Sequence, residues 1–495
     1  GAACGSPPDE PIRSTPHQDA CSAMHPPFDI PADLDTPVSA YRKLGQFRPC
    51  FLLESAEGGT QLARYSFIGL DPAFTVSLPA DGSGVEIRTL DGIEKLPAPT
   101  DAPGYLDMLR QCRDRAPRLG PLPPGVPFAG GIVGVSGYDA VRFFERLPRP
   151  EGRSVTTPTA LYCAPRSVLV FDHLTRRMAL LHAGEAWERE SLRREVVHAL
   201  HGAHPPEPVR SGHAPAQHSL THDEFLDRVA SAKNDIYNGE VFQLVLSIRS
   251  ESEAHTEPFQ VYRALRMLNP SAYMYFLDIE GVQVIGASPE ALFRCQNGLA
   301  TLRPIAGTRK RGEDEAQDRA LEAELLADPK EAAEHVMLVD LARNDLGRVA
   351  RPGTIRVDPY RIVERYSHVM HLVSGVRGEL DEGADAMDLL AASFPAGTLV
   401  GTPKVRAMQL IDDYEPVGRG FYAGAVGYFA KPIDGAPASA DKAICIRTLV
   451  FDGDKYAYQA GAGIVADSQP HAEYQEVRSK VAVLERALEL SEGGW

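Results

Sequence analysis

The sequence is poor in cysteine, in long apolar runs and in positive charge, and each shortage argues against a class of protein. Its seven scattered cysteines never stand in C-x-x-C spacing, which argues against a disulfide framework or a zinc site. No apolar run approaches the roughly 18 residues of a membrane helix, and the N-terminus lacks the apolar core of a signal peptide. A net charge of −16 disfavours nucleic acid and anionic membranes. We therefore expect a soluble, cytoplasmic protein in which an anionic ligand would need local cations or a metal.

The 495 residues divide into four stretches by composition. Residues 1–27 are rich in proline and lack periodicity, as in a disordered tail or an extension added by cloning. Residues 28–200 are β-rich with interspersed helical patterns, 201–219 form a Pro/Gly/His-rich connector, and 220–495 form a second folded region. Strands come in runs rather than in alternation with helices, which predicts an α+β fold with two largely antiparallel sheets flanked by helices. The predicted helical segments are 103–115, 185–201, 315–346, 384–392, 403–411 and 471–490, together with a helix capped by Thr221 and ended by Gly239.

Two carboxylates stand three residues apart in "ADSQPHAEYQE", residues 466–476. Ser468 is a suitable N-cap and Pro470 suits a first helical turn, so Glu473 and Glu476 are expected on one face of an opening turn. Acids at a helix start also simply complement the helix dipole. The pair alone therefore leaves a structural and a functional interpretation open.

The same arrangement recurs in "ADPKEAAEHVM", residues 327–337. Asp328 can cap, Pro329 takes the first turn, and Glu331 and Glu334 share a face. If the two helix starts converge, four carboxylates face one another, which is costly unless a hard divalent cation lies between them. All-oxygen ligation then favours Mg²⁺. Two independent dipole-complementing pairs remain the alternative.

Other segments combine apolar strands with polar or glycine positions. "QAGAGIVAD" places Gly461 and Gly463 at a strand end, where a ligand could approach the backbone. His371, Arg447 and Tyr422 lie in apolar segments and by default are packed or locally paired. A buried strand arginine also suits a ligand carboxylate, because its guanidinium can make a bidentate contact.

A basic cluster surrounds the glycine of "RPIAGTRKRG", residues 303–312. In an acidic protein such a cluster is either a solvated surface or a collector of anions. Its members are Arg303, Arg309, Lys310 and Arg311.

Six segments occur in order: "PIAGTRKRG", "EAAEHVMLVDLARNDLGRV", "YSHVMHLVSGVRG", "FPAGTLVGTPKVRAMQLID", "GRGFYAGAVGYF" and "QAGAGIVADSQPHAEYQE". Together they resemble the signature segments of the chorismate-utilising enzymes, most closely the anthranilate synthase branch. The resemblance is dense over about 220–490 and thinner over about 28–75. It implies a Mg²⁺-dependent site in the C-terminal part and a reaction in which chorismate and ammonia give anthranilate and pyruvate, at the start of tryptophan biosynthesis.

The resemblance also implies roles for individual residues. Glu334 and Glu476 would be direct metal ligands, with Glu331 and Glu473 acting directly or through water. Glu290 would be the general acid that protonates the departing C4 hydroxyl, which requires that it be partly protonated near neutral pH. His371 and Thr398 would complete the catalytic set, the role of the histidine being left open. The implied substrate-binding residues are Gly307, Thr308, Tyr422, Arg447, Gly461, Ala462, Gly463 and Lys480.

Two positions discriminate among branches of the family. Enzymes that add water at C2 carry a lysine where this chain has Gln243, which cannot act as a base. Enzymes that aminate at C4 read P-I-K-G-T, whereas this chain has Ala306. Both features favour anthranilate. No glutaminase motif is present, so ammonia would come from a separate glutamine amidotransferase subunit or from solution.

The resemblance further implies feedback inhibition by tryptophan. The departure from the family pattern is Ala272, where proline is usual and where its loss could loosen the pocket. Two rival functions are a salicylate or aminodeoxychorismate synthase, and a non-catalytic tryptophan sensor or scaffold. The expected tryptophan contacts are Leu53, Glu54, Ser55, Tyr273 and Met274.

Overall fold

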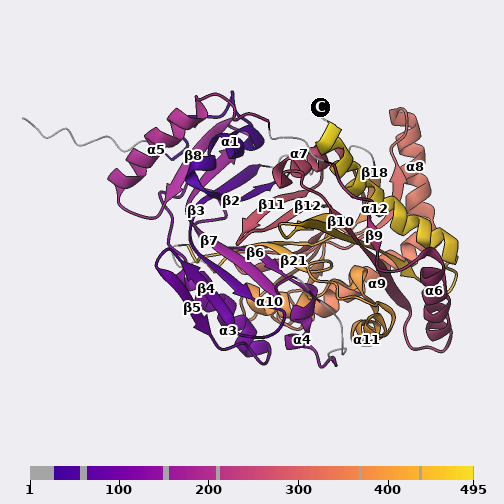
Figure 1. Ribbon diagram of the computed structural model, residues 1–495. Helices are drawn as coiled ribbons and strands as arrows, with labels where there is room; N and C mark the ends of the chain where they lie inside the picture. The colour runs from indigo at the N-terminus through magenta and orange to yellow at the C-terminus, as the bar shows by residue number, and fades with distance from the viewer. Residues whose placement is uncertain are drawn as a thin grey trace, which may run out of the picture.

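The chain folds into two broad antiparallel sheets with helices around them (Figure 1). The predicted tail, apart from its last residue, lies outside the described part, as do Cys4 and Cys21. The computed structural model describes residues 27–55, 64–148, 155, 157–207, 212–366, 369–433 and 437–493.

Two long strands hold the sheets together. β3 (Tyr65–Leu78) pairs with β7 (Ala160–Asp172) along its whole length, with a register irregularity between Pro72 and Phe74. On one side of this irregularity the pair continues to β2 and β8, and on the other to β4 and β6. The same two strands therefore belong to both sheets.

The first sheet includes the strand that carries Gly461 and Gly463. Its order, read from the pairings, is β1 (Ile30–Pro31), β8 (Arg177–His182), β7, β3, β2 (Pro49–Glu54), β11 (Tyr273–Ile279), β12 (Val282–Ser288), β23 (Thr448–Phe451), β24 (Lys455–Ile464) and β10 (Gln243–Glu253), with β9 (Gln217–His218) and β20 (Gly401–Thr402) on β10.

The second sheet runs from the other halves of β3 and β7. Its order is β5 (Gly92–Leu96), β4 (Val85–Thr89), β3, β7, β6 (Gly131–Ser136), β21 (Ala425–Ala430), β22 (Ala440–Ile444), β13 (Ala291–Gln296), β14 (Leu299–Leu302), β19 (Val376–Glu379) and β16 (Arg356–Val357). A separate small sheet orders β15 (Ile305–Lys310), β18 (Val369–Val373) and β17 (Ile362–Arg365).

One apolar core lies between the two sheets and a larger one lies beneath the helices. The inner core joins Phe51 and Tyr275 of the first sheet to Val135 and Val426 of the second. The outer core collects the buried faces of helices such as α7 and α12. The helices are α1 (Pro37–Lys43), α3 (Ala102–Arg115), α4 (Val141–Phe144), α5 (Ala186–Leu200), α6 (His222–Tyr237), α7 (Pro258–Leu268), α8 (Glu315–Ala327), α9 (Pro329–Gly347), α10 (Ala386–Ser393), α11 (Lys404–Tyr414) and α12 (Pro470–Gly493), with 3-10 turns η1 (Gly45–Phe47), η2 (Tyr138–Ala140) and η3 (Gly397–Leu399).

The α+β prediction with two antiparallel sheets is confirmed. Strands from both predicted folded regions share these sheets, because β2 pairs with β11 and β6 with β21. The division into regions at 201–219 therefore stays a prediction. Within the described ranges, no helix combines the length and apolar character needed to cross a membrane. The five described cysteines are buried and free.

Of the predicted helix N-caps Asp328 and Ser468, the structure contains only the first. Asp328 caps α9 as predicted, accepting hydrogen bonds from Lys330 N at 2.9 Å and Glu331 N at 3.2 Å. This cap and Pro329 divide the predicted segment 315–346 into α8 and α9. The prediction that Ser468 caps the last helix is wrong: α12 begins at Pro470, and the Ser468 hydroxyl instead accepts from Val465 N in the preceding turn.

Candidate active site

Glu290 lies in the short link between β12 and β13, next to η3. Its Oε1 accepts a hydrogen bond from Thr398 Oγ1 at 3.0 Å. Burial raises the pKa of Glu290 to about 7, although the Thr398 hydrogen bond and the charges of Arg447 and Lys480 act in the opposite direction. Near neutral pH this carboxyl is thus partly protonated, which is the condition set for a general acid.

Arg447 interrupts what the sequence suggested was one strand. It adopts a left-handed backbone with φ of 48° between β22 and β23. Its carbonyl accepts from Ala287 N at 3.1 Å, and its Nη1 donates to Asn269 Oδ1 at 3.5 Å. The turn therefore fixes a guanidinium close enough to Glu290 to act on its pKa.

The glycines of β24 have close neighbours. A Cβ on Gly461 would lie 2.8 Å from the Tyr422 hydroxyl oxygen, and one on Gly463 would lie 2.6 Å from Gln243 Nε2. Ala462 is buried between them. Lys480 of α12 donates to Gly461 O at 2.8 Å. The segment "QAGAGIVAD" thus lies mostly in a strand, and the side chains of Tyr422, Gln243 and Lys480 lie close to its backbone.

His371 faces Thr308 across the small sheet. The two residues are paired in register between β18 and β15. His371 Nδ1 lies 3.1 Å from Thr308 Oγ1 and 3.1 Å from Gly307 O. Since a carbonyl only accepts, the bond to Gly307 requires a proton on Nδ1 and leaves Nε2 as the basic nitrogen. Gly307 has φ of 61°, and a Cβ there would lie 3.0 Å from Glu331 Oε2.

The two glutamate pairs lie in the first turns of α9 and α12. The pKa of Glu334 is raised by burial and then by the charges of Glu331 and Glu476. The pKa of Glu473 is raised by burial, and Glu476 contributes to that rise. The contribution of Glu476 to the pKa of Glu334, about 140 positions away, places the two helix starts within electrostatic range of each other.

The donor set suits a hard cation in kind, because every group is a carboxylate. In the described ranges, however, no three His, Cys, Asp or Glu side chains are gathered closely enough to hold a metal ion. Two of the carboxylates are engaged by cations instead: Glu331 pairs with Arg309 at 3.3 Å and Glu476 with Lys480 at 2.8 Å. Magnesium stays a prediction.

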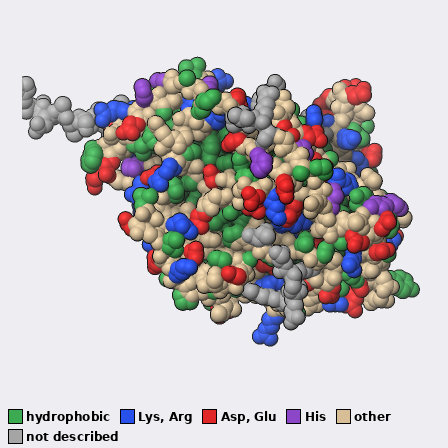
Figure 2. Space-filling model, viewed as in Figure 1, with side chains coloured by type: hydrophobic (Ala, Val, Ile, Leu, Met, Phe, Trp, Pro, Cys, Tyr) green, Lys and Arg blue, Asp and Glu red, His purple; other side chains and the backbone are tan. Residues whose placement is uncertain are grey.

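The basic cluster around Gly307 is held in local ion pairs. Arg309 contacts Glu324 and Asp328 as well as Glu331. Arg311 pairs with Asp318, and Arg303 with Glu364. These three arginines therefore support neighbouring elements, and the interpretation of the cluster as an anion collector is not supported. Acidic and basic side chains are similarly interspersed over the visible face in Figure 2.

The residues predicted to bind tryptophan lie together. Pairing of β2 with β11 brings Leu53 and Glu54 beside Met274. A cavity of about 940 Å³ is lined by Leu53, Glu54, Ser55, Tyr273 and Met274, and by Ala272. The Glu54 carboxylate is held by Arg266 of α7 at 3.0 Å.

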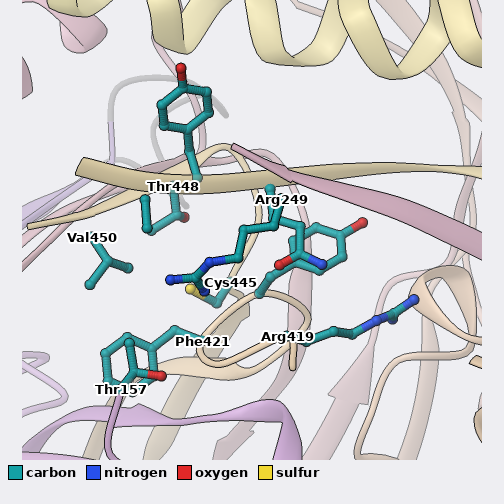
Figure 3. A pocket seen from close by; sticks show the side chains of 11 residues that line it. Thr157, Arg249, Arg419, Phe421, Cys445, Thr448 and Val450 are labelled. Atoms are coloured by element: carbon teal, nitrogen blue, oxygen red, sulfur yellow. The ribbon is translucent and has the colours of Figure 1, made fainter. Parts of the chain in front are cut away.

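Sequence reasoning missed a buried ion pair next to Tyr422. Arg419 Nη2 donates to Glu415 Oε1 at 2.7 Å, and both side chains are nearly inaccessible to solvent. Figure 3 shows the small cavity beside it, with Arg249 and Cys445 at its wall and the Arg419 guanidinium extending away. The sequence signal is the segment "GRGFY", in which a single charged residue stands among glycines and aromatic residues.

A half-buried carboxyl with a pKa near neutrality and a fixed guanidinium lie beside antiparallel strands, and two glutamate pairs lie at the starts of α9 and α12. Together they define an enzyme for an anionic small molecule. The chain belongs to the family of chorismate binding enzymes, whose model matches residues 49–486. The resemblance found in the sequence is confirmed.

Similar proteins carry more specific names. Anthranilate synthase component 1 of Thermus thermophilus is 44% identical over 473 residues, covering 94% of this chain and 97% of that protein. The protein of the same name from Acinetobacter calcoaceticus is 42% identical over 477 residues, covering 94% of each. The crystal structure of anthranilate synthase component I from Streptococcus pneumoniae superposes with a TM-score of 0.74 at 33% identity, covering 92% of this chain and 98% of that one.

Proposed function

We propose that this chain is the large subunit of an anthranilate synthase, a carbon–oxygen lyase that converts chorismate and ammonia into anthranilate, pyruvate and water. The observation that carries this proposal is the state of Glu290. Its carboxyl has a pKa of about 7, accepts a hydrogen bond from Thr398 and lies near the charge of Arg447. The names of its relatives support the same reaction. We place the protein in the cytoplasm, at the first step of tryptophan biosynthesis.

Substrate binding uses the groups that surround Glu290. Arg447 and Tyr422 hold the enolpyruvyl carboxylate, with backbone contacts from Gly461, Ala462 and Gly463. Gly307, Thr308 and Thr398 line the ring. Glu331, Glu334, Glu473 and Glu476 would hold Mg²⁺, which when bound neutralises the ring carboxylate of chorismate. Lys480, between Glu476 and Gly461 O, connects the two parts of the site.

In the proposed reaction, side chains of the site transfer the protons or orient the groups that do. Ammonia attacks C2 while the C4 hydroxyl leaves, and Glu290 supplies the proton that makes it water. Loss of the C2 proton then expels the enolpyruvyl group as pyruvate and leaves an aromatic ring. His371 assists from the small sheet through the basic Nε2 that its bond to Gly307 leaves. The Thr398 hydroxyl orients the acid through its 3.0 Å hydrogen bond.

Selectivity for ammonia at C2 is supported by two side chains. The Gln243 amide lies against Gly463, where it offers no base to activate water. Ala306 is buried opposite Leu372 on β18 and offers no nucleophile for amination at C4. Ammonia, in contrast, attacks without a base.

The defining experiment incubates the purified chain with chorismate, Mg²⁺ and an ammonium salt at mildly alkaline pH. We expect anthranilate, identified by mass, and its loss on addition of EDTA. Salicylate, aminodeoxychorismate or unchanged chorismate would contradict the proposed reaction. Anthranilate that persists in EDTA would contradict only the role of the metal.

The chain would take its ammonia from glutamine through an amidotransferase subunit. The predicted pairing is supported by relatives whose names contain "component 1". With glutamine in place of ammonium, we expect anthranilate only when this second subunit is added. Product from glutamine and the purified chain alone would contradict this arrangement.

Tryptophan is proposed as a feedback inhibitor that occupies part of the large cavity. Leu53→Ala should raise the tryptophan concentration for half-inhibition by about tenfold, since a buried leucine side chain contributes about 1.5–3 kcal/mol. The control is Leu299→Ala, which alters the same cavity outside the predicted contacts. Both variants should keep uninhibited activity. No inhibition of the unaltered chain at millimolar tryptophan would remove the proposal.

A further inference from the structure

The buried pair Glu415 and Arg419 contacts three segments that carry substrate-site residues. Glu415 follows α11 and Arg419 lies in the turn before β21; they are 3% and 2% exposed. Arg419 Nε and Nη2 donate to the two carboxylate oxygens of Glu415 at 2.9 and 2.7 Å. This bidentate geometry fixes the plane of the guanidinium.

The guanidinium reaches the segment that orients the general acid. Arg419 Nη1 donates to Leu399 O at 2.7 Å, one residue beyond Thr398. Arg419 Nη2 also donates to Val245 O of β10 at 3.1 Å. Val245 N also donates to Val400 O. The end of η3 and β10 are therefore joined both directly, by this backbone bond, and through the guanidinium of Arg419. The position of the Thr398 hydroxyl therefore depends on a chain of fixed contacts.

The carboxylate reaches the glycine strand. Glu415 Oε1 accepts from Ser247 N at 2.9 Å and from Ser247 Oγ at 2.6 Å. Ser247 stands opposite Gly461 in the β10–β24 register. The Arg419 guanidinium also lies 5.4 Å from the centre of the Tyr422 ring. Of the proposed binding contacts, Tyr422 thus lies beside this pair, and Gly461 is linked to it through Ser247.

We propose that Glu415 and Arg419 are positioning residues for the reaction: the pair holds η3, β10 and the Tyr422 turn so that Thr398 aligns Glu290 with the departing hydroxyl. This inference rests on the proposed function. The remaining hydrogen bonds of the buried pair go to the backbone beside Thr398 and to Ser247 opposite Gly461, so its position is coupled to the proposed site. A buried ion pair is also a weak source of net stability, because desolvation of both charges offsets their attraction.

The test is the double variant Glu415→Gln/Arg419→Met. It removes both charges together, so no unpaired charge is buried, and the Gln oxygen still accepts from Ser247. We expect a melting temperature close to that of the unaltered chain and a kcat for anthranilate lowered about 10- to 100-fold, as for misplacement of a catalytic group. KM for chorismate should rise by a smaller factor, because Tyr422 and Gly461 are proposed binding contacts.

A pH profile separates positioning from a purely structural role. The Thr398 hydrogen bond lowers the pKa of Glu290. Its loss should move the alkaline limb of kcat/KM, measured at constant free ammonia, to higher pH in the double variant. The control is Arg142→Met/Asp412→Leu, which removes an ion pair between α4 and α11 whose described contacts reach no proposed site residue. The control should leave kcat and the limb unchanged.

Normal kcat and an unmoved limb in the folded double variant would overturn the inference. If the double variant does not fold, Arg419→Lys decides, because lysine keeps the charge but cannot reach Glu415, Leu399 O and Val245 O together. Normal kcat and pH profile in that variant would equally overturn it. The unaltered chain is assayed alongside, so failure of the proposed function appears as absence of anthranilate from that chain.

Discussion

Replacement of Glu290 by Gln is expected to lower kcat for anthranilate by about 10²- to 10⁴-fold, the usual contribution of a positioned general acid. Gln keeps an oxygen to accept from Thr398 but cannot transfer a proton to the leaving hydroxyl. Chorismate affinity should be nearly retained, because the proposed binding contacts are Arg447 and Tyr422. The measurement is steady-state anthranilate formation with ammonium as the nitrogen source. Unchanged kcat would show that another group protonates the hydroxyl.

The pH dependence of the unaltered enzyme should report the same carboxyl. At constant free ammonia, kcat/KM for chorismate should fall tenfold per pH unit above about pH 7, where Glu290 loses its proton. The decline should be absent from the residual activity of Glu290→Gln. A profile that is flat through pH 8 in the unaltered enzyme would contradict this assignment.

The same substitution should raise stability while it removes activity. The folded state raises the pKa of Glu290 from 4.5 to about 7, so between these values it binds more protons than the unfolded state. The stability of the unaltered chain therefore falls as pH rises through this window, and above pH 7 Glu290→Gln should gain up to about 3 kcal/mol in free energy of unfolding. At pH 4 the two chains should unfold alike.

Asp278→Asn is the matched control for that measurement. Burial also raises the pKa of Asp278, whose partner is Gln283 on the neighbouring strand. This variant should also gain stability at neutral pH, but it should keep full activity because Asp278 belongs to none of the proposed contacts. Loss of activity in the control would mean that stabilisation itself impairs turnover.

Several helix starts could be predicted from the sequence because their signals are local. Proline at a first turn, an aspartate cap and alternating apolar residues act over a few positions, as at Asp328 and Pro329. The break at Arg447 was missed, since a left-handed residue inside an apolar run has no local mark when it is not glycine. The α8–α9 division was marked by Pro329 but assigned as one helical segment.

The site residues were found through ordered motifs, and the structure adds what spacing cannot. Periodicity could not show that Thr398 bonds Glu290, since more than a hundred residues separate them. It also could not show that Arg309 and Lys480 engage the glutamates. The Glu415–Arg419 pair escaped for the same reason: its partners Leu399 and Ser247 come from two other elements.

Glu334→Gln is expected to abolish stabilisation by Mg²⁺ together with activity. If the four glutamates hold the ion, Mg²⁺ at about 100 times its Kd should stabilise the unaltered chain by about 2.7 kcal/mol, seen as a rise in melting temperature. Loss of one ligand should raise the Mg²⁺ concentration for half-maximal stabilisation by more than about tenfold. Glu476→Gln should behave alike, because its charge acts on Glu334 from the other helix.

Without Mg²⁺ the expected sign reverses. The Glu334 carboxylate is disfavoured by burial and by the charges of Glu331 and Glu476, so its neutral replacement should melt at a higher temperature than the unaltered chain in EDTA. Glu489→Gln on α12 is the control, because Glu489 pairs only with exposed Arg486 among the contacts described and should change neither curve. Two curves that cross as Mg²⁺ is added would distinguish a cation site from two helix starts that merely carry acids. Parallel curves would mean that the glutamates complement the helix dipoles and that the reaction takes its metal, if any, elsewhere.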